Sequence, residues 1–263
     1  MSYETITLNT DERGVARLTL NRPDKHNALN GKLIEELTQA AEQLAIDDNV
    51  RVVVLSGTGK SFCAGGDFNW FKGNAEADRA TRIRESSKLA HMLNALNALP
   101  KPLIGRIQGS AYGGGVGMIS VCDTAVGIDI ARFGLTEVRL GLIPANISPH
   151  VVARIGTANS RATMLSGALF SAQKAEKIGL LNETVTADDL DARVDEIIAE
   201  HLEAALGAVG ETKRLIDYVA NHNMADNMIY TADRLADAWE TDEGTTGINS
   251  FLNKKLPPWR SSK

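Results

Sequence analysis

Strand-like segments alternate with amphipathic helices through the first half of this chain, and this order constrains the fold more than any other feature. The sequence VARLTLN at 15–21 predicts a strand, and NGKLIEELTQAAEQLAID at 30–47 predicts a helix with one apolar face behind an Asn30 cap. A further strand is expected at VRVVVLSG, 50–57, and a further helix at 76–98. Because strands that alternate with helices build α/β domains, we expect an α/β fold.

The last third of the chain has a different pattern. From about residue 187 onward it is helical with little strand, and it ends in INSFLNKKLPPWR. No Ser/Gly-rich linker, low-complexity segment or repeat of fixed period divides the chain. We therefore expect a core over 1–198 followed by a helical region over 199–263.

Composition narrows the class of function. The chain has 263 residues, of which 43% are hydrophobic and 23% charged, as in ordinary globular proteins. Its net charge of −5 argues against a nucleic-acid partner or an anionic membrane, since either would need a clustered basic surface. The N-terminus lacks a basic stretch followed by an apolar segment, and no window approaches about 18 apolar residues. We expect a soluble, cytoplasmic protein that contacts neither nucleic acid nor membrane.

Several common sites are not supported. Cys63 and Cys122 lack the spacing of a zinc site, and the histidines show no metal-ligand pattern, so no metal is expected and both thiols should be reduced and buried. GTGKS at 57–61 resembles part of a P-loop, but Val54 stands where its first glycine is required. The later glycine run departs from the dinucleotide fingerprint at Met118, and no GxSxG or HExxH motif is present.

Two glycine-containing stretches carry a stronger signal: SFCAGGDFNW at 61–70 and AYGGGVGM at 111–118. Glycine loses more backbone freedom on folding than any other residue, so its use here needs a reason. One interpretation is a pair of tight turns. The other is that unpaired backbone N–H groups, where a strand gives way to a helix, converge into an oxyanion hole for a carbonyl oxygen that becomes negative during a reaction.

Glu137 in FGLTEVRLGLIP is the candidate acid or base, because it lies between apolar positions rather than in a charged run. A surface glutamate paired with Arg139 is the alternative interpretation. A carboxyl in an apolar pocket has a raised pKa, which suits proton transfer near neutral pH.

Taken in order, the motifs NRPDKHNAL, FCAGGD, YGGGVG, CD, FGLTEVRLGLIP and FLNKKLPPW resemble the crotonase, or enoyl-CoA hydratase/isomerase, superfamily over nearly the whole chain. The resemblance implies a spiral of ββα units with a C-terminal helical region that assembles as a homotrimer or homohexamer. It also implies an acyl-CoA thioester as substrate, with coenzyme A as part of that substrate and no separate cofactor.

The resemblance also implies the site residues. The oxyanion-hole N–H groups would belong to Gly66 and Gly114, with Glu137 as the catalytic carboxylate. Ala64 would lie near the adenine end of CoA, and Phe251 and Lys254 would reach a CoA, in some relatives that of a neighbouring subunit. Other residues matched to the CoA and acyl site are Lys25, His26, Ala28, Leu29, Asp67, Phe68, Tyr112 and Gly117.

One position departs from the pattern. Hydratases of this superfamily resembling its best-known enzyme carry a second glutamate where this chain has Gly117. The longer run from the glycines to 151 looks most like bacterial methylglutaconyl-CoA hydratases of leucine breakdown and related hydratases of terpenoid breakdown. Gly117 then either supplies room for a carboxylated acyl group or permits close helix packing.

We expect an enoyl-CoA hydratase that uses Glu137 for proton transfer at Cα. A Δ3,Δ2-enoyl-CoA isomerase is the chemical alternative, because one carboxylate suffices to move a proton between Cα and Cγ. A non-catalytic acyl-CoA-binding protein is the alternative of another class, since fold does not fix activity. Trp70, Phe71 and Tyr112 either shape the acyl pocket or are plain core, and Arg84 or Arg139 could meet a distal carboxylate.

Overall fold

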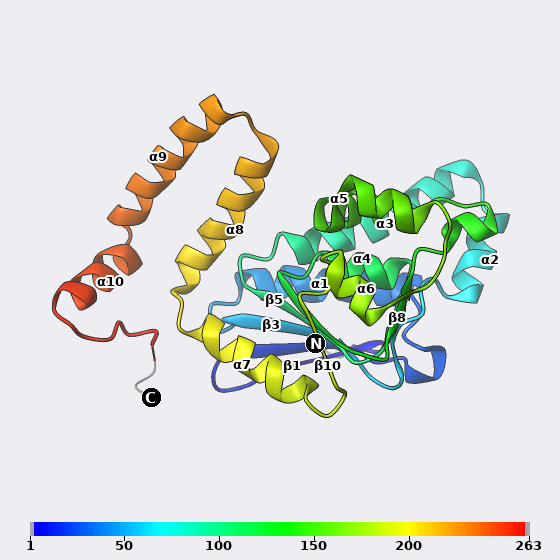
Figure 1. Cartoon of the computed structure of the whole chain (residues 1–263), viewed down its shortest axis with the longest axis horizontal. Coiled ribbons are helices and arrows are strands. Elements are labelled where there is room, and N and C mark those ends of the chain that lie inside the picture. The colour runs from blue at the N-terminus through cyan, green and yellow to red at the C-terminus, as the bar shows by residue number, and fades with distance from the viewer. Residues whose placement is uncertain (1–2, 261–263) are drawn as a thin grey trace.

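Two β-sheets form the centre of the molecule, which a computed structural model describes over residues 3–260 (Figure 1). The strands of the larger sheet are β1 (Ile6–Thr10), β2 (Val15–Leu20), β3 (Val52–Gly57), β5 (Leu103–Ile107), β7 (Thr124–Ile128) and β10 (Glu183–Val185). They lie side by side in the order β1-β2-β3-β5-β7-β10. Neighbours run parallel, except that β1 is antiparallel to β2.

A smaller sheet is built from three strands that directly follow strands of the larger one, and from β9, which follows α5. It contains β4 (Ser61–Cys63), β6 (Ser110–Tyr112), β8 (Arg132–Gly134) and β9 (Phe170–Ser171), in that order. Thus β3 leads into β4, β5 into β6 and β7 into β8, and helices follow each pair. This repeated strand, strand, helix order confirms the expected α/β fold of ββα units.

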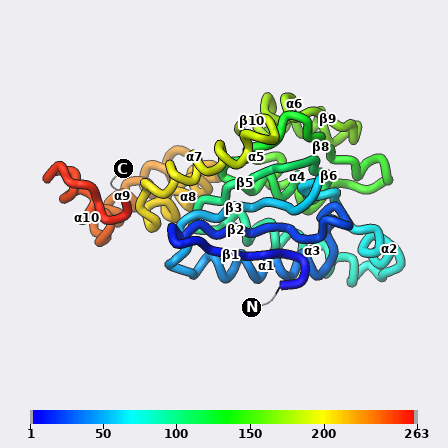
Figure 2. Tube along the Cα trace, turned by 90° about the horizontal axis from the view of Figure 1, so that it is seen from below, coloured from blue at the N-terminus to red at the C-terminus, as the bar shows by residue number. Residues whose placement is uncertain are grey.

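Helices cover both faces of the larger sheet. Those within residues 3–260 are α1 (Gly31–Ile46), α2 (Phe68–Glu76), α3 (Arg79–Asn97), α4 (Gly114–Ser120), α5 (Ser148–Met164), α6 (Ala172–Lys177), α7 (Leu190–Leu202), α8 (Leu206–Asn221), α9 (Met224–Glu240) and α10 (Asp242–Leu252), with short 3₁₀ helices η1 (Pro23–Lys25) and η2 (Glu137–Leu140). Helices α1 and α3 pack together, and α7 packs on β3, β5 and β7 (Figure 2).

The first helix begins as predicted, because the Asn30 side chain accepts a hydrogen bond from the N–H of Leu33. The helix expected over 76–98 is α3, and a separate helix, α2, precedes it. The Asp67 side chain caps α2 by accepting a hydrogen bond from the N–H of Asn69, and the Asp78 side chain caps α3 by accepting one from the N–H of Thr81. Helix α3 lies where it was expected, whereas α2 was not predicted.

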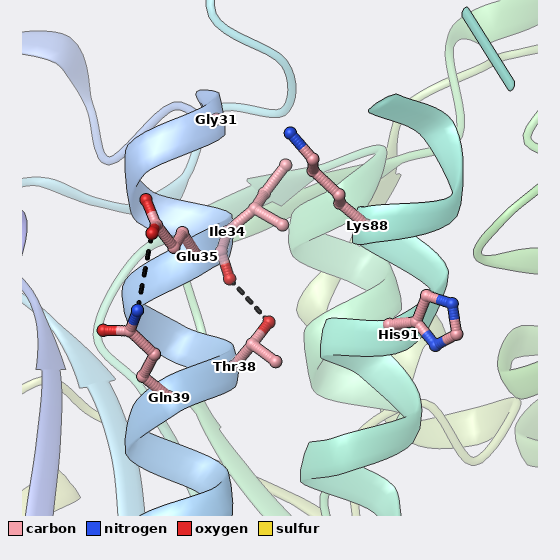
Figure 3. A pocket seen from close by; sticks show the side chains of 7 residues that line it. All are labelled: Gly31, Ile34, Glu35, Thr38, Gln39, Lys88 and His91. Carbon is pink, nitrogen blue, oxygen red and sulfur yellow. Dashed lines mark hydrogen bonds between the residues drawn. The ribbon is translucent and has the colours of Figure 1, made fainter. Parts of the chain in front are cut away.

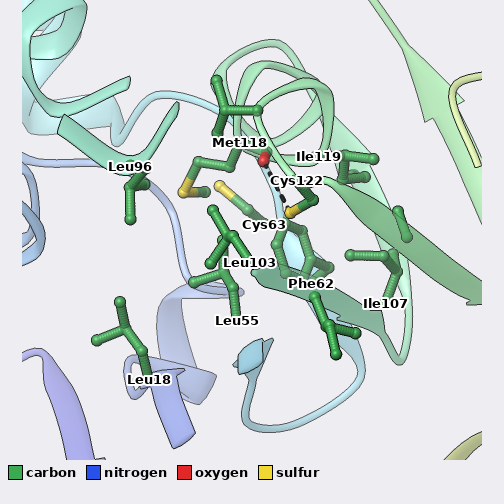
Figure 4. Packing of buried hydrophobic residues seen from close by; sticks show 14 of the residues in the cluster. Leu18, Leu55, Phe62, Cys63, Leu96, Leu103, Ile107, Met118, Ile119 and Cys122 are labelled. Carbon is green, nitrogen blue, oxygen red and sulfur yellow. Dashed lines mark hydrogen bonds between the residues drawn. The ribbon is translucent and has the colours of Figure 1, made fainter. Parts of the chain in front are cut away.

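The core lies where the two sheets meet α3 and α4. All residues of β3 are buried, and Phe62, Cys63, Met118 and Cys122 pack together beside it (Figure 4). Both cysteines are free, as expected, and burial raises the pKa of each thiol to about 12. These thiols therefore serve as small apolar core residues rather than as nucleophiles.

Helices α8, α9 and α10 form an arm, residues 206–252, that projects away from both sheets in the two views (Figures 1 and 2). Its first helix is tied to the core by an ion pair of 2.7 Å between Lys213 and Asp123. The division expected at residue 198 lies inside α7, whose apolar face is buried, and the arm begins at α8. Residues 261–263 of the expected helical region lie outside the described part.

Candidate active site

A cavity of about 450 Å³ opens where the smaller sheet, α2, α3 and the segment after β8 meet. It is lined by residues spread from 29 to 147 along the chain. They are Leu29, Ala64, Gly65, Gly66, Trp70, Phe71, Ser86, Leu89, Tyr112, Gly113, Gly114, Thr136, Glu137, Leu140, Leu142, Ile143, Pro144, Ala145, Asn146 and Ile147. Both glycine stretches and Glu137 therefore come together in one mostly apolar cavity.

Gly66 follows β4 and faces the cavity with a free backbone donor. Its neighbours are fixed to Leu29: the Leu29 N–H donates to the Gly65 carbonyl at 2.7 Å, and the Asp67 N–H donates to the Leu29 carbonyl at 2.8 Å. Within residues 3–260, the Gly66 N–H itself donates no hydrogen bond. Only glycine fits here, because a Cβ at Gly66 would overlap the ring of Phe71.

Gly114 supplies a second donor, as the first residue of α4. Its N–H also lacks an acceptor among the described residues, since first-turn N–H groups have no intrahelical partner. The preceding residue, Gly113, has φ of 50°, in the left-handed region that side chains rarely adopt, and its N–H donates to the Gly134 carbonyl at 2.9 Å. The second glycine stretch thus begins a helix whose first residue lines the cavity and has a free N–H group.

Glu137 is the first residue of η2 and lies against Gly113. A Cβ atom at Gly113 would stand 3.0 Å from its Oε1 atom. The Oε2 atom is buried and has no hydrogen-bond partner among the described residues. Burial raises the pKa of Glu137 above its usual range, despite a hydrogen bond from its own backbone N–H that lowers it. The alternative interpretation, a surface pair with Arg139, is absent from the ion pairs of residues 3–260; Arg139 donates to the Ser166 carbonyl instead.

Other polar groups border the cavity at a distance along the chain from Glu137. Asn146 donates a hydrogen bond of 2.6 Å to the Ser86 hydroxyl, which joins α3 to the segment before α5. The indole N–H of Trp70 is buried and unpartnered among the described residues. Trp70 and Phe71, with ring centroids 5.6 Å apart, form an aromatic wall of the cavity on α2. This agrees with the interpretation that they shape a pocket and not with the one that they are plain core.

Gly117 does not line the cavity. It is buried within α4, and a Cβ atom there would lie 2.6 Å from Cγ2 of Ile147, which does line the cavity. The space where the second glutamate of related hydratases would start is therefore filled by an apolar side chain. Of the two interpretations of Gly117, this contact favours close packing over room for the substrate.

The remaining matched residues divide into two groups. Leu29, Ala64 and Tyr112 line the cavity, whereas Lys25, His26, Ala28, Asp67 and Phe68 do not. The Phe68 side chain is 80% exposed. Asp67 is turned away into a buried ion pair with Arg22, 2.9 Å long. The roles predicted for these residues toward CoA stay predictions.

Phe251 and Lys254 lie at the end of the arm. The Phe251 side chain is 80% exposed, and Lys254 has a left-handed backbone with φ of 54°. Neither lines the cavity of its own chain.

Sequence analysis missed part of the lining. Leu89 belongs to the buried apolar face of α3 with Met92, Leu93 and Leu96, a pattern that in sequence indicates core rather than cavity lining. Ser86 lies one turn before Leu89. Leu142 and Ile143 belong to the same stretch as Glu137. These apolar residues beside Glu137 could have been predicted from the sequence as lining residues, and in the structure their side chains are exposed.

A second hollow, of about 470 Å³, lies between α1 and α3 (Figure 3). Apart from His91, its polar side chains are engaged along their own helices: Gln39 donates to Glu35 at 3.4 Å, Thr38 to the Ile34 carbonyl at 2.8 Å, and Lys88 to Glu85 at 2.9 Å. Unlike the cavity with Glu137, it holds no buried unpartnered polar group among the described residues.

Two further findings concern residues 3–260 alone. None of their helices is both long and apolar enough to cross a membrane. They contain no group of three or more His, Cys, Asp or Glu side chains placed to hold a metal ion.

Proteins of known family share both the sequence and the fold of this chain. Residues 10–262 match the family model described as enoyl-CoA hydratase/isomerase. The chain belongs to the enoyl-CoA hydratase/isomerase family. A 2,3-dehydroadipyl-CoA hydratase of Escherichia coli is 31% identical over 255 residues, which are 95% of this chain and 96% of that protein. The resemblance to the superfamily is confirmed, and its subgroup remains a prediction.

Solved structures agree with this membership. The crystal structure of an enoyl-CoA hydratase from Shewanella pealeana matches with a TM-score of 0.94 at 33% identity, over 97% of this chain and 96% of that one. An enoyl-CoA hydratase from Mycobacterium smegmatis matches with a TM-score of 0.92 at 29% identity, over 98% of this chain and 100% of that one. The enoyl-CoA hydratase/isomerase fold thus extends over core and arm alike.

Proposed function

We propose that this enzyme is an enoyl-CoA hydratase that adds water across the α,β double bond of an acyl-CoA thioester. One observation carries the proposal: Glu137 has a buried, unpartnered carboxylate oxygen in the same cavity as the free N–H groups of Gly66 and Gly114. A donor pair for a developing negative charge and a group that can move a proton are what such a reaction needs.

In this scheme the thioester oxygen accepts hydrogen bonds from Gly66 and Gly114, and the charge that develops on it when water adds at Cβ is stabilised there. Glu137 transfers the proton to Cα. Loss of one oxyanion donor typically costs about 10²- to 10³-fold in rate, and general acid/base catalysis contributes about 10²- to 10⁴-fold. The scheme calls for no metal or cofactor beyond the coenzyme A of the substrate.

A single carboxylate has to serve both steps of proton transfer. Glu137 is the one acidic side chain among the described lining residues, and Ile147 fills the space beside Gly117. We propose that Glu137 accepts a proton from the attacking water and delivers a proton to Cα. Burial raises the pKa of Glu137, and this is the direction that helps it to hold a proton between the two steps.

The same observation favours a Δ3,Δ2-enoyl-CoA isomerase as a second candidate. Isomerisation moves a proton between Cα and Cγ and requires no water, so one carboxylate suffices. Incubation with a 2-enoyl-CoA and a 3-enoyl-CoA in ¹⁸O-labelled water separates the two activities. Label in a 3-hydroxyacyl product supports the hydratase, and migration of the double bond without label supports the isomerase. Binding without turnover of either would support an acyl-CoA-binding protein.

For the acyl group we propose an uncharged chain. The subgroup resemblance suggested a branched or carboxylated substrate such as 3-methylglutaconyl-CoA. However, no Lys or Arg is among the described lining residues, and a carboxylate moved into an apolar cavity without a partner is costly. Arg84 and Arg139 are exposed and lie outside the lining. A panel of straight, branched and carboxylated enoyl-CoA substrates tests this; the highest kcat/KM on 3-methylglutaconyl-CoA would contradict the uncharged chain.

We further propose that the chain works as a homotrimer or homohexamer. The arm exposes more large apolar side chains than a stable monomer normally shows, which supports burial against other copies. They are Ile216, Val219, Met224, Met228, Ile229, Leu235, Trp239, Phe251 and Leu252. A monomer in sedimentation at micromolar concentration would contradict this assembly.

A further inference from the structure

Leu29 touches both oxyanion candidates. Its backbone bonds to Gly65 and Asp67 hold the Gly66 peptide between them, at 2.7 and 2.8 Å. Its side chain packs on the second donor, because a Cβ atom at Gly114 would overlap Cδ1 of Leu29. Whatever fixes Leu29 therefore fixes the spacing of the two N–H groups.

Arg22 ties the segment that ends in Leu29 to the segment that contains Gly66. Its Nη1 atom donates to the carbonyl of Ala28, and its Nη2 atom forms an ion pair of 2.9 Å with Oδ2 of Asp67. The side chains of this pair are 15% and 11% exposed. Burial raises the pKa of Asp67, but the hydrogen bonds from Arg22 and from backbone N–H groups outweigh it and lower the pKa. The pair is therefore charged at neutral pH.

The segment needs such a contact, because it contains two residues in the left-handed region. His26 has φ of 50° and Asn27 has φ of 54°. Conformations of this kind persist where the surroundings enforce them. The Asn27 amide donates to the carbonyls of Thr58 and Ser61 at 2.9 and 3.0 Å, and its Oδ1 accepts from the Arg22 N–H at 2.9 Å. Arg22 thus engages the segment at Asn27 and at Ala28, through its backbone and its side chain.

We propose that Arg22 is a positioning residue for the oxyanion hole, which locks the segment 22–29 against 64–67 and so sets the places of the Gly66 and Gly114 N–H groups. The inference rests on the proposed function, because it assigns a device that serves those two donors. Arg22 does not line the cavity and touches neither substrate nor Glu137. Its effect on the reaction passes through Leu29, and a misplacement of about 1 Å can cost about 10²-fold in rate.

The test uses the full-length chain and three variants. Arg22→Met removes both side-chain contacts. Arg22→Lys keeps the charge, but a single ammonium group lacks the planar fork that reaches Ala28 and Asp67 together. Arg154→Met is the matched control: Arg154 is also a partly buried clamp, which donates to the carbonyls of Cys122 and Gly179 at 2.9 and 2.8 Å and lies outside the cavity lining.

Two readouts separate positioning from general loss of structure. The first is kcat and KM with an enoyl-CoA, alongside Tm. The second is the absorption band of bound cinnamoyl-CoA, which moves to longer wavelength when donors polarise its thioester carbonyl. We expect Arg22→Met to lower kcat by about 10- to 100-fold with little change in KM, and to weaken the wavelength shift. Arg22→Lys should recover much of the Tm but not the kcat. Arg154→Met should lower Tm and leave both readouts of the folded enzyme near wild type.

The inference is overturned if Arg22→Met keeps kcat within about threefold of wild type, or if Arg154→Met loses kcat and wavelength shift to the same extent. Failure of the proposed function looks different. A wild-type chain that polarises cinnamoyl-CoA but adds water to no enoyl-CoA contradicts the proposed hydratase activity. The positioning role of Arg22 is still tested in that case, because the wavelength shift of bound cinnamoyl-CoA is either weakened or kept in Arg22→Met. A wild-type chain that does not polarise the probe overturns the oxyanion assignment and this inference with it.

Discussion

The core and the arm have similar helices but differ in what they bury. In the core, every residue of β3 is buried, and α1 buries seven of its 16 residues. In the arm, α8 buries Gly210, α9 buries Asn227, and α10 buries none. All three arm helices still carry an apolar face, so the difference lies in the partner available to each face rather than in the residues themselves.

This contrast separates two sources of stability. Burying a large apolar side chain contributes about 1.5–3 kcal/mol, and helices of this length are marginal in water without such packing. The core obtains that contribution within one chain. The contacts among α8, α9 and α10 leave Trp239 more than half exposed, so the arm obtains less of this contribution within one chain. The groups proposed for catalysis lie in the core.

The largest expected effect tests whether the chemistry belongs to the core. Glu137→Gln removes the one acidic group of the described cavity lining while keeping its shape, so kcat should fall by at least about 10²-fold. CoA binding should be nearly unchanged. The matched control is Glu240→Gln on α9, an exposed arm residue whose loss should leave kcat unaltered. Turnover is measured by steady-state kinetics, and a Glu137→Gln variant that keeps most of its kcat would remove Glu137 from the mechanism.

The second prediction compares one aromatic residue from each region. Phe62 is fully buried, and Phe62→Ala should lower the free energy of unfolding by about 3–5 kcal/mol at any protein concentration. Trp239 is 57% exposed, so Trp239→Ala should act on assembly instead. The Tm of Trp239→Ala should equal that of wild type in dilute solution. At higher protein concentration assembly raises the Tm of wild type, and the Tm of the variant should then be the lower of the two.

Urea unfolding and sedimentation over a range of protein concentrations distinguish the two cases. The contrast between core and arm fails if Trp239→Ala destabilises the chain as much as Phe62→Ala without changing its oligomeric state. It also fails if the wild-type chain is monomeric throughout.

The third prediction concerns packing inside the core. Gly117→Glu forces a side chain against Ile147, so overpacking should cost about 1–3 kcal/mol, and the buried carboxylate adds to it. Because Ile147 lines the cavity, activity should fall equally on crotonyl-CoA and on a carboxylated enoyl-CoA. Gly31→Glu is the control, since a Cβ atom there meets nothing within 4 Å. Retained or increased activity on crotonyl-CoA alone, with unchanged Tm, would restore the interpretation that Gly117 makes room for substrate.

The sequence predicted those parts of the core that depend on local patterns. The apolar run of β3, the Asn30 cap and the two glycine pairs each follow from neighbouring residues, and each lies where expected. Helix α3 was predicted, but α2 was missed, because α2 buries no side chain and so has no apolar face that would mark it in the sequence.

Contacts between distant segments could not be predicted in this way. The bond from Asn146 to Ser86 joins positions 60 residues apart, and the contact of Gly117 with Ile147 depends on how α5 approaches α4. The direction of the arm is set by few contacts, so its apolar faces predicted burial without indicating a partner. Local pattern thus pointed to the two glycine stretches and to Glu137, and the family resemblance to Gly66 and Gly114, but neither reached the distant side chains that pack around them.

The smallest expected effect is on stability, and it again compares Glu137 with Glu240. Burial raises the folded-state pKa of Glu137 above its ordinary value of 4.5, so the folded chain holds that proton more tightly than the unfolded chain. Stability from this group is complete below the ordinary pKa and is lost as pH rises through the raised one. The side chain of Glu137→Gln does not titrate, so this variant does not lose that stability as pH rises. Relative to wild type it should therefore gain stability as pH rises from the ordinary value of 4.5 through the raised folded-state pKa, and hold a constant advantage above that. Urea unfolding at several pH values measures the difference. Glu240→Gln on the exposed arm should stay within about 0.5 kcal/mol of wild type throughout. If the difference in unfolding free energy between Glu137→Gln and wild type is constant with pH, or decreases as pH rises, the buried carboxylate of Glu137 does not lower the stability of the core.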